Sequence, residues 1–153
     1  MVEFMRQLEI KLAKVEDGAF LLEMLILSLK SLPQVAIKSA VEIEGMARLE
    51  LGGWETERDY AFVARLNQQQ AGAVWLKAQG ELTARYFTLG IAVAPEFQGR
   101  KVGTALLEYA LDYCKRNQGS SVSLKVHPTN LPALQLYRRL GFEEISLELK
   151  KKF

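Results

Sequence analysis

The spacing of apolar residues predicts that the chain begins with one strand and two helices. Leucine and isoleucine alternate with charged residues over 8–12, which is typical of a strand with one buried face. A mostly apolar run over 19–29 follows and is ended by Pro33. A membrane span needs roughly 20 apolar residues, so this shorter run predicts a buried helix or a subunit interface. A second helix is expected over 36–49, with these side chains facing inward: Ile37, Ala40, Val41, Ile43 and Ala47.

The rest of the pattern alternates strands with helices. Strands are predicted over residues 60–66, 73–77, 86–93, 121–126 and 142–150. Helices are predicted over 101–117 and 131–140. This order favours a single α/β (α+β) domain over residues 1–153, built on one mixed sheet.

Composition narrows the class of protein. The chain has 153 residues, of which 49% are apolar and 25% charged, as in ordinary globular domains. A net charge of +2 gives no reason to expect a nucleic-acid partner. One cysteine, Cys114, excludes an internal disulfide, and one histidine without a CxxC pair argues against a metal site. The N-terminus has no signal-peptide core, so a cytoplasmic protein without a membrane partner is expected.

Charge is concentrated in the segment 41–60. This segment holds six acidic residues and two basic ones. Two interpretations remain open: a solvated helix face followed by a loop, or an acidic wall that attracts a cationic substrate.

A small-residue loop between the strand at 86–93 and the next helix is the strongest chemical signal. Main-chain N–H groups at such a turn bind anions, above all phosphates. The residues expected to wrap a diphosphate are Gln98, Gly99, Arg100, Lys101, Val102, Gly103 and Thr104. Taken alone, this pattern also fits a tight strand-to-helix turn with two solvated basic residues.

A second motif lies downstream of this loop. It comprises the run 124–130, Ala133, and Leu-Tyr-x-x-x-Gly-Phe over 136–142. Together with 91–95 and the loop, it resembles the GCN5-related N-acetyltransferase (GNAT) family, specifically over 86–142. One position departs from the family, because Lys101 stands where the first loop glycine is usual. A side chain is compatible with the loop if Lys101 keeps φ below zero.

The resemblance implies both a fold and a donor. The implied fold is a mixed, mostly antiparallel sheet of six to seven strands, flanked by about four helices, with splayed fourth and fifth strands. Acetyl-CoA is the implied donor, without a metal; its pantetheine arm would lie in that splay and pair with the main chain of Ile91 and Val93. The implied cofactor-binding set is completed by Ala92, Asn130, Ala133 and Tyr137.

Tyr137 is the expected general acid, because a tyrosine hydroxyl can give a proton to the leaving thiolate. Packing against the sheet is its alternative role. Asn130 is expected either to bind the cofactor arm or to cap the last helix. The general base stays open between His127, Glu81 and a water chain. Cys114 is expected to pack in the core.

These residues predict an N-acetyltransferase that moves acetyl from acetyl-CoA directly to a primary amine, with a small cationic amine favoured. Four residues are expected either to build the acceptor pocket or to lie in core and loop: Trp54, Glu55, Tyr60 and Trp75. The alternatives are a non-catalytic acyl-CoA-binding module and a protein lysine acetyltransferase. Family members that act on ribosomal-protein N-termini place a glutamate where Lys125 stands, which argues against that acceptor. A homodimer is a further expectation.

Overall fold

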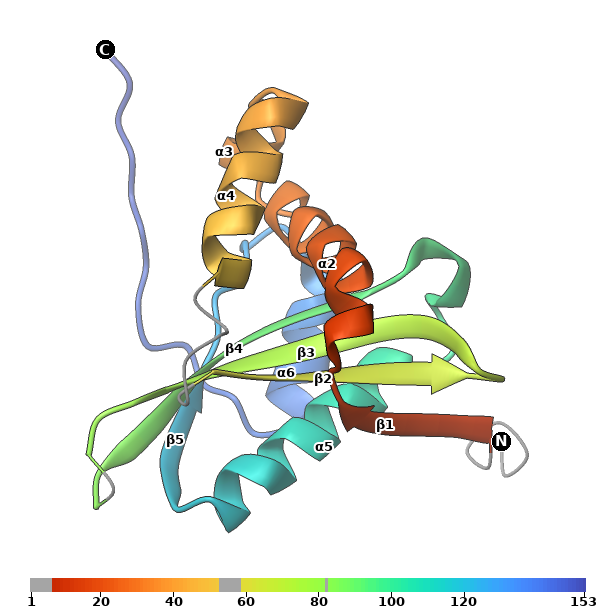
Figure 1. The fold of residues 1–153 in the computed structure, drawn as a ribbon. Coiled ribbons are helices and arrows are strands. Elements are labelled where there is room, and N and C mark those ends of the chain that lie inside the picture. The colour runs from red at the N-terminus through yellow and green to blue at the C-terminus, as the bar shows by residue number, and fades with distance from the viewer. Residues whose placement is uncertain (1–6, 53–58, 82) are drawn as a thin grey trace.

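The computed structural model describes residues 7–52, 59–81 and 83–153, and a single sheet organises them (Figure 1). The described strands are β1 (Leu8–Leu12), β2 (Asp59–Leu66), β3 (Gln69–Gln79), β4 (Arg85–Val93) and β5 (Gly119–Ser123). They lie side by side in chain order. Each neighbouring pair is antiparallel except β4 and β5, which run parallel.

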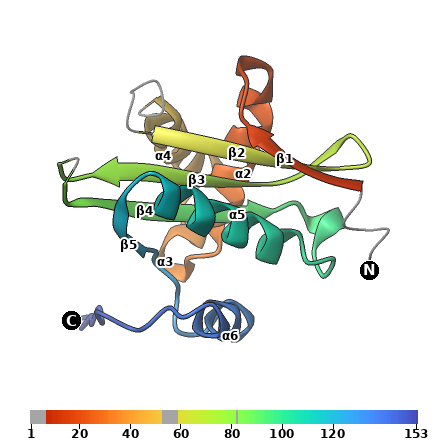
Figure 2. The ribbon, with the colours of Figure 1, turned by 90° about the horizontal axis from the view of Figure 1, so that it is seen from below.

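Helices cover both faces of this sheet. On one face lie α2 (Gly18–Lys30) and α4 (Ala40–Gly52), joined through the short α3 (Pro33–Ala36), and on the other lies α5 (Val102–Arg116). The last helix, α6 (Leu131–Arg139), lies beyond the β4–β5 edge of the sheet (Figure 2). Within the described ranges, no helix is long and apolar enough to cross a membrane.

Both faces of the sheet carry a packed apolar layer. On α5, Val102, Leu106 and Cys114 are buried. On α2, the central turns bury Phe20 and Leu25. The apolar run over 19–29 is therefore a core helix of this chain.

The edge between β4 and β5 is open over half its length. Their pairing joins Arg85–Thr88 to Gly119–Ser123 and then stops, while β4 continues to Val93. We call the unpaired side of residues 89–93 the open edge. The predicted splay of the fourth and fifth strands is confirmed by this geometry.

Two strand predictions are wrong. The described residues form five strands rather than six to seven, and no strand covers 142–150. Ile145, Leu147 and Leu149 are 83%, 76% and 83% exposed on a segment that runs outward from the sheet (Figure 1). Alternation gives such a segment an apolar face, but a strand also needs a neighbour to pair its backbone.

The predicted second helix is wrong in its start and in part of its inner face. It begins at Ala40, where the Glu42 N–H donates to Ser39 Oγ at 3.2 Å as an N-cap. Ile43 and Ala47 are buried as predicted, but Ile37 and Val41 are 86% and 81% exposed, and Ala40 is also exposed. Pro33 starts a separate helical turn there, so Ile37 falls in the connection between two helices.

Candidate active site

The small-residue loop over 98–104, which we call the anion loop, is anchored where β4 ends. A short 3₁₀ turn over Pro95–Phe97 buries the Phe97 ring, and Gln98 Nε2 donates a hydrogen bond to the Val93 carbonyl at 3.2 Å. Gly99 then takes a φ of +78°, a left-handed conformation that glycine adopts without steric cost. The loop is thereby held at the open edge.

Lys101 also adopts the left-handed conformation, with φ +64° and ψ +16°. The condition set for a side chain at this position, a negative φ, is therefore not met, and a β-carbon in this region is strained. Lys101 is the N-cap of α5, and no side chain caps the helix there. The first N–H groups of a helix have no partner within it, so this N-terminus presents free donors. That arrangement fits a diphosphate.

Positive charge flanks these amides. The Arg100 guanidinium lies 5.8 Å from the centre of the Phe97 ring. Within the described part of the chain, neither Arg100 nor Lys101 has an acidic partner within ion-pair distance. Val102 is buried, so only its backbone can face a ligand. A β-carbon at Gly103 would meet only Val93 Cγ2, at 3.5 Å, which leaves room beside the loop.

Tyr137 stands on α6, beyond the open edge. Its ring packs edge-on against Phe142, with centroids 5.8 Å apart and an interplanar angle of 61°. Burial raises the pKa of Tyr137, so the hydroxyl keeps its proton well above neutral pH. In the described ranges that hydroxyl makes no hydrogen bond with protein. A protonated and unpartnered hydroxyl is suited to proton donation.

The start of α6 is capped by Asn130. Its Oδ1 accepts a hydrogen bond from the Ala133 N–H at 3.4 Å. The capping role considered for Asn130 is thus present, and it occupies the Ala133 amide. Contact of either residue with a cofactor stays a prediction.

The two candidate bases from the sequence lie at different ends of β4. His127 follows β5 on the far side of the open edge, and its Nδ1 accepts from the Thr129 N–H at 3.3 Å. The same Nδ1 lies 2.7 Å from Thr129 Oγ1, so Thr129 engages this ring nitrogen through both its backbone and its hydroxyl. Glu81 is exposed in the β3–β4 turn, before Arg85. Arg85 itself is about 13 Å along the strand from Leu89, so Glu81 does not approach the open edge.

Comparison with known proteins decides the family. A sequence model described as the acetyltransferase (GNAT) family matches residues 27–142. The chain belongs to this family. The match covers the anion loop, the open edge and Tyr137, which confirms the resemblance drawn from the motifs.

Relatives of this GNAT chain match over short stretches. A mycothiol acetyltransferase of Clavibacter sepedonicus is 38% identical over 80 residues, covering 52% of this chain and 25% of the relative. The ribosomal protein bS18-alanine N-acetyltransferase of Escherichia coli K12 is 37% identical over 57 residues, 37% of this chain and 38% of that one. The matched stretches thus span well under half of these relatives.

Solved structures agree with the GNAT fold. A predicted acetyltransferase with acetyl-CoA from Clostridium acetobutylicum superposes with a TM-score of 0.70 at 14% identity. The superposition covers 95% of this chain and 96% of that one. At this identity the likeness establishes the fold.

One functional candidate in this GNAT domain was not singled out from the sequence. Glu50, in the last turn of α4, accepts a hydrogen bond from the Trp75 side chain on β3. Partial desolvation raises the pKa of Glu50, while that bond and the nearby Lys77 lower it. The sequence signalled Glu50 only as one residue of the acidic segment 41–60, because its partner lies 25 positions away.

The aromatic candidates for the acceptor pocket divide between the two faces. The Tyr60 ring packs against Tyr113 of α5, with centroids 5.2 Å apart, so Tyr60 belongs to the core under α5. Trp75 is buried on the opposite face, beneath α4. Trp54 and Glu55 lie outside the described residues.

Cys114 is a core residue, as predicted. It is buried in α5, and burial raises the pKa of its thiol to about 12. The group stays a protonated thiol at neutral pH and is a poor nucleophile. Within the described residues, no cluster of three His, Cys, Asp or Glu side chains could hold a metal ion.

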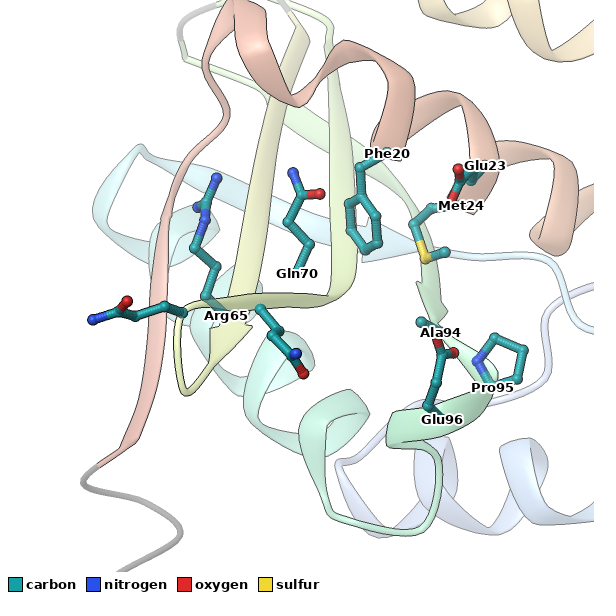
Figure 3. A pocket seen from close by; sticks show the side chains of 10 residues that line it. Phe20, Glu23, Met24, Arg65, Gln70, Ala94, Pro95 and Glu96 are labelled. Atoms are coloured by element: carbon teal, nitrogen blue, oxygen red, sulfur yellow. The ribbon is translucent and has the colours of Figure 1, made fainter.

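A separate cavity of about 560 Å³ lies between α2 and the ends of β2–β4 (Figure 3). Its lining includes Glu23, Arg65 and Glu96. Arg65 is held by the buried Asp17, which also accepts from Gln70 Nε2 at 2.8 Å. None of the predicted site residues lines this cavity. It is thus distinct from the open edge.

Proposed function

We propose that this chain is an N-acetyltransferase that moves an acetyl group from acetyl-CoA to a primary amine. One observation carries the proposal: α5 begins uncapped, on two left-handed residues, where β4 has separated from β5. This joins an anion site to an unpaired strand edge. The acetyl-CoA in a GNAT structure of the same fold supports this donor.

Different groups of the chain would bind the diphosphate and the pantetheine arm of acetyl-CoA. The amides from Gly99 to Thr104 would hold the diphosphate, and Arg100 and Lys101 would add charge-assisted contacts. The main chain of Ile91 to Val93 would pair with the pantetheine arm as an added strand. These contacts would bring the thioester to the start of the open edge.

Tyr137 is the proposed general acid. The amine nitrogen forms a bond to the acetyl carbon as the carbon–sulfur bond breaks, and the leaving thiolate takes the phenolic proton. Two properties support this role: the Tyr137 hydroxyl is protonated at neutral pH, and it has no hydrogen-bond partner among the described residues. General acid catalysis of this kind contributes typically 10²–10⁴-fold to a rate.

A small cationic amine is the favoured acceptor. On α4, two of the three carboxylates form ion pairs with nearby basic residues: Glu42 with Lys38, and Glu44 with Arg48. The third, Glu50, instead contacts Trp75 of the sheet. The names of the matched relatives refer to mycothiol and a ribosomal-protein alanine. Cytoplasmic location and a homodimer stay predictions.

Calorimetric titration with acetyl-CoA, and with 3′-dephospho-CoA, tests the donor. Tyr137→Phe should then lower turnover by about 10²–10⁴-fold with unchanged acetyl-CoA affinity, because only the proton donor is lost. Tyr109→Phe is the matched control, because the Tyr109 ring packs against Phe62 of β2, away from the open edge. Absence of binding at millimolar acetyl-CoA would overturn the proposed function, and unchanged turnover in Tyr137→Phe would overturn the acid.

A further inference from the structure

The Trp75 indole lies directly over Gly90 of β4. The two residues are register partners, and a β-carbon at Gly90 would sit 2.0 Å from Trp75 Nε1. Any side chain at position 90 would therefore displace the indole. Gly90 comes two residues after Thr88, the last β4 residue paired with β5. The indole N–H is thus placed at the point where the open edge begins.

Glu50 is held at the same point from α4. The Glu50 carboxylate accepts a hydrogen bond from the Trp75 indole N–H. The indole nitrogen lies over Gly90, so the carboxylate is held close to this glycine. Glu50 is exposed overall, so solvent or a ligand can reach it. A carboxylate is thereby fixed beside the beginning of the open edge, on the face opposite α5.

We propose that Glu50 binds the acceptor's ammonium group and takes up its proton. This inference rests on the proposed transferase function and adds the base which that function lacks. The first ammonium proton passes to the Glu50 carboxylate and then to solvent. The free amine attacks the acetyl carbon, and the carbon–sulfur bond breaks. The second nitrogen proton then passes to solvent, and the Tyr137 phenolate recovers a proton from solvent in place of the one that it gave to the thiolate.

Glu50 suits this role better than the other carboxylates and the histidine considered. Desolvation moves its pKa upward, toward the range in which a carboxylate accepts protons efficiently near neutral pH. His127 has its Nδ1 engaged, and Glu81 lies beyond the paired end of β4. Glu44, on the same helix, is instead held by Arg48 at 2.7 Å.

Trp75 acts in this arrangement as a positioning residue. Its N–H bond orients the carboxylate and favours the charged form, and Lys77 of β3 does the same through its charge. In the described ranges, α2 also packs against α4 and carries the charged residues Glu23 and Lys30. Loss of the indole N–H should therefore raise the pKa of Glu50.

The first test uses Glu50→Gln, with Glu44→Gln as the matched control on the same helix. Spermidine and an alanine-leading peptide serve as acceptors, and thiol release reports turnover. We expect Glu50→Gln to lower kcat/KM by about 10²–10⁴-fold while acetyl-CoA affinity and Glu44→Gln activity stay unchanged. Equal losses in both variants would overturn the assignment in favour of general charge attraction. A wild-type chain that does not bind acetyl-CoA would instead defeat the proposed function.

The second test needs no turnover. In protein labelled with ¹³C at the glutamate side-chain carboxyl, the Glu50 resonance is the one missing from Glu50→Gln. It should titrate above the ordinary glutamate range and shift on addition of methylammonium chloride. Trp75→Phe should move its titration, and the acidic limb of any pH–rate profile, to higher pH. An ordinary titration without a methylammonium response would overturn the proposal.

Discussion

Helices α5 and α6 carry similar amphipathic patterns but are buried very differently. Of the 15 residues of α5, Val102, Leu106, Leu107, Ala110 and Cys114 are buried, whereas none of the nine residues of α6 is. The reason is position: α5 lies across paired strands, while α6 lies beyond the edge where β4 and β5 separate (Figure 2). An apolar stripe therefore does not by itself show whether a helix closes a core or borders a site.

The difference matches the roles proposed for the two helices. The buried face of α5 fixes its N-terminus and hence the anion loop. The stripe of α6 leaves Leu136, Tyr137 and Leu140 only partly buried against the core. A side chain that contacts a substrate has to stay partly exposed, as Tyr137 does.

The largest expected effect comes from truncating one leucine on each helix. Leu106→Ala, at a fully buried position on α5, should lower the free energy of unfolding by about 2–5 kcal/mol through lost burial and a residual cavity. Leu136→Ala, on the partly exposed α6, should cost less than about half as much. Urea unfolding measures both variants. Equal losses would contradict the looser packing of α6.

A smaller effect is expected at the left-handed Lys101. Lys101→Gly should stabilise the fold by about 1 kcal/mol, because glycine adopts a φ of +64° without strain. Lys101→Ala keeps a β-carbon and so keeps the strain, which makes it the matched control.

Both Lys101 variants remove the positive charge. Calorimetry should therefore show similarly weakened acetyl-CoA binding in each, with a stability gain in Lys101→Gly alone. A gain of the same size in Lys101→Ala would argue against backbone strain at this position.

The smallest effect is expected at the end of the chain. Deletion of residues 145–153 should change the free energy of unfolding by less than about 0.5 kcal/mol, since Ile145, Leu147 and Leu149 are exposed. The truncation keeps the Arg138–Glu144 ion pair, in which Nη2 and Oε1 are 2.6 Å apart. A loss of several kcal/mol, or a change of oligomeric state in sedimentation, would show that this segment pairs with a sheet edge in solution.

Local patterns predicted most of the elements and the loop of the candidate site. The alternation in 8–12, the stripe of α5 and the small-residue loop at 97–103 each depend on near neighbours, and each appears in the structure. The predicted strand at 142–150 failed because a strand requires a partner that its own sequence does not supply. The inner face of α4 shifted because the helix start was displaced to the Ser39 cap.

The sequence by itself determined the family, the anion loop and the candidate acid, since each is carried by residues at short, fixed spacing. Only the tertiary structure decided that Lys101 is left-handed and that Glu50 meets Trp75 over Gly90. These properties depend on backbone closure and on contacts between residues 25 and 15 positions apart. Periodicity reports which face of an element is apolar, whereas the pairing of elements sets what each face meets.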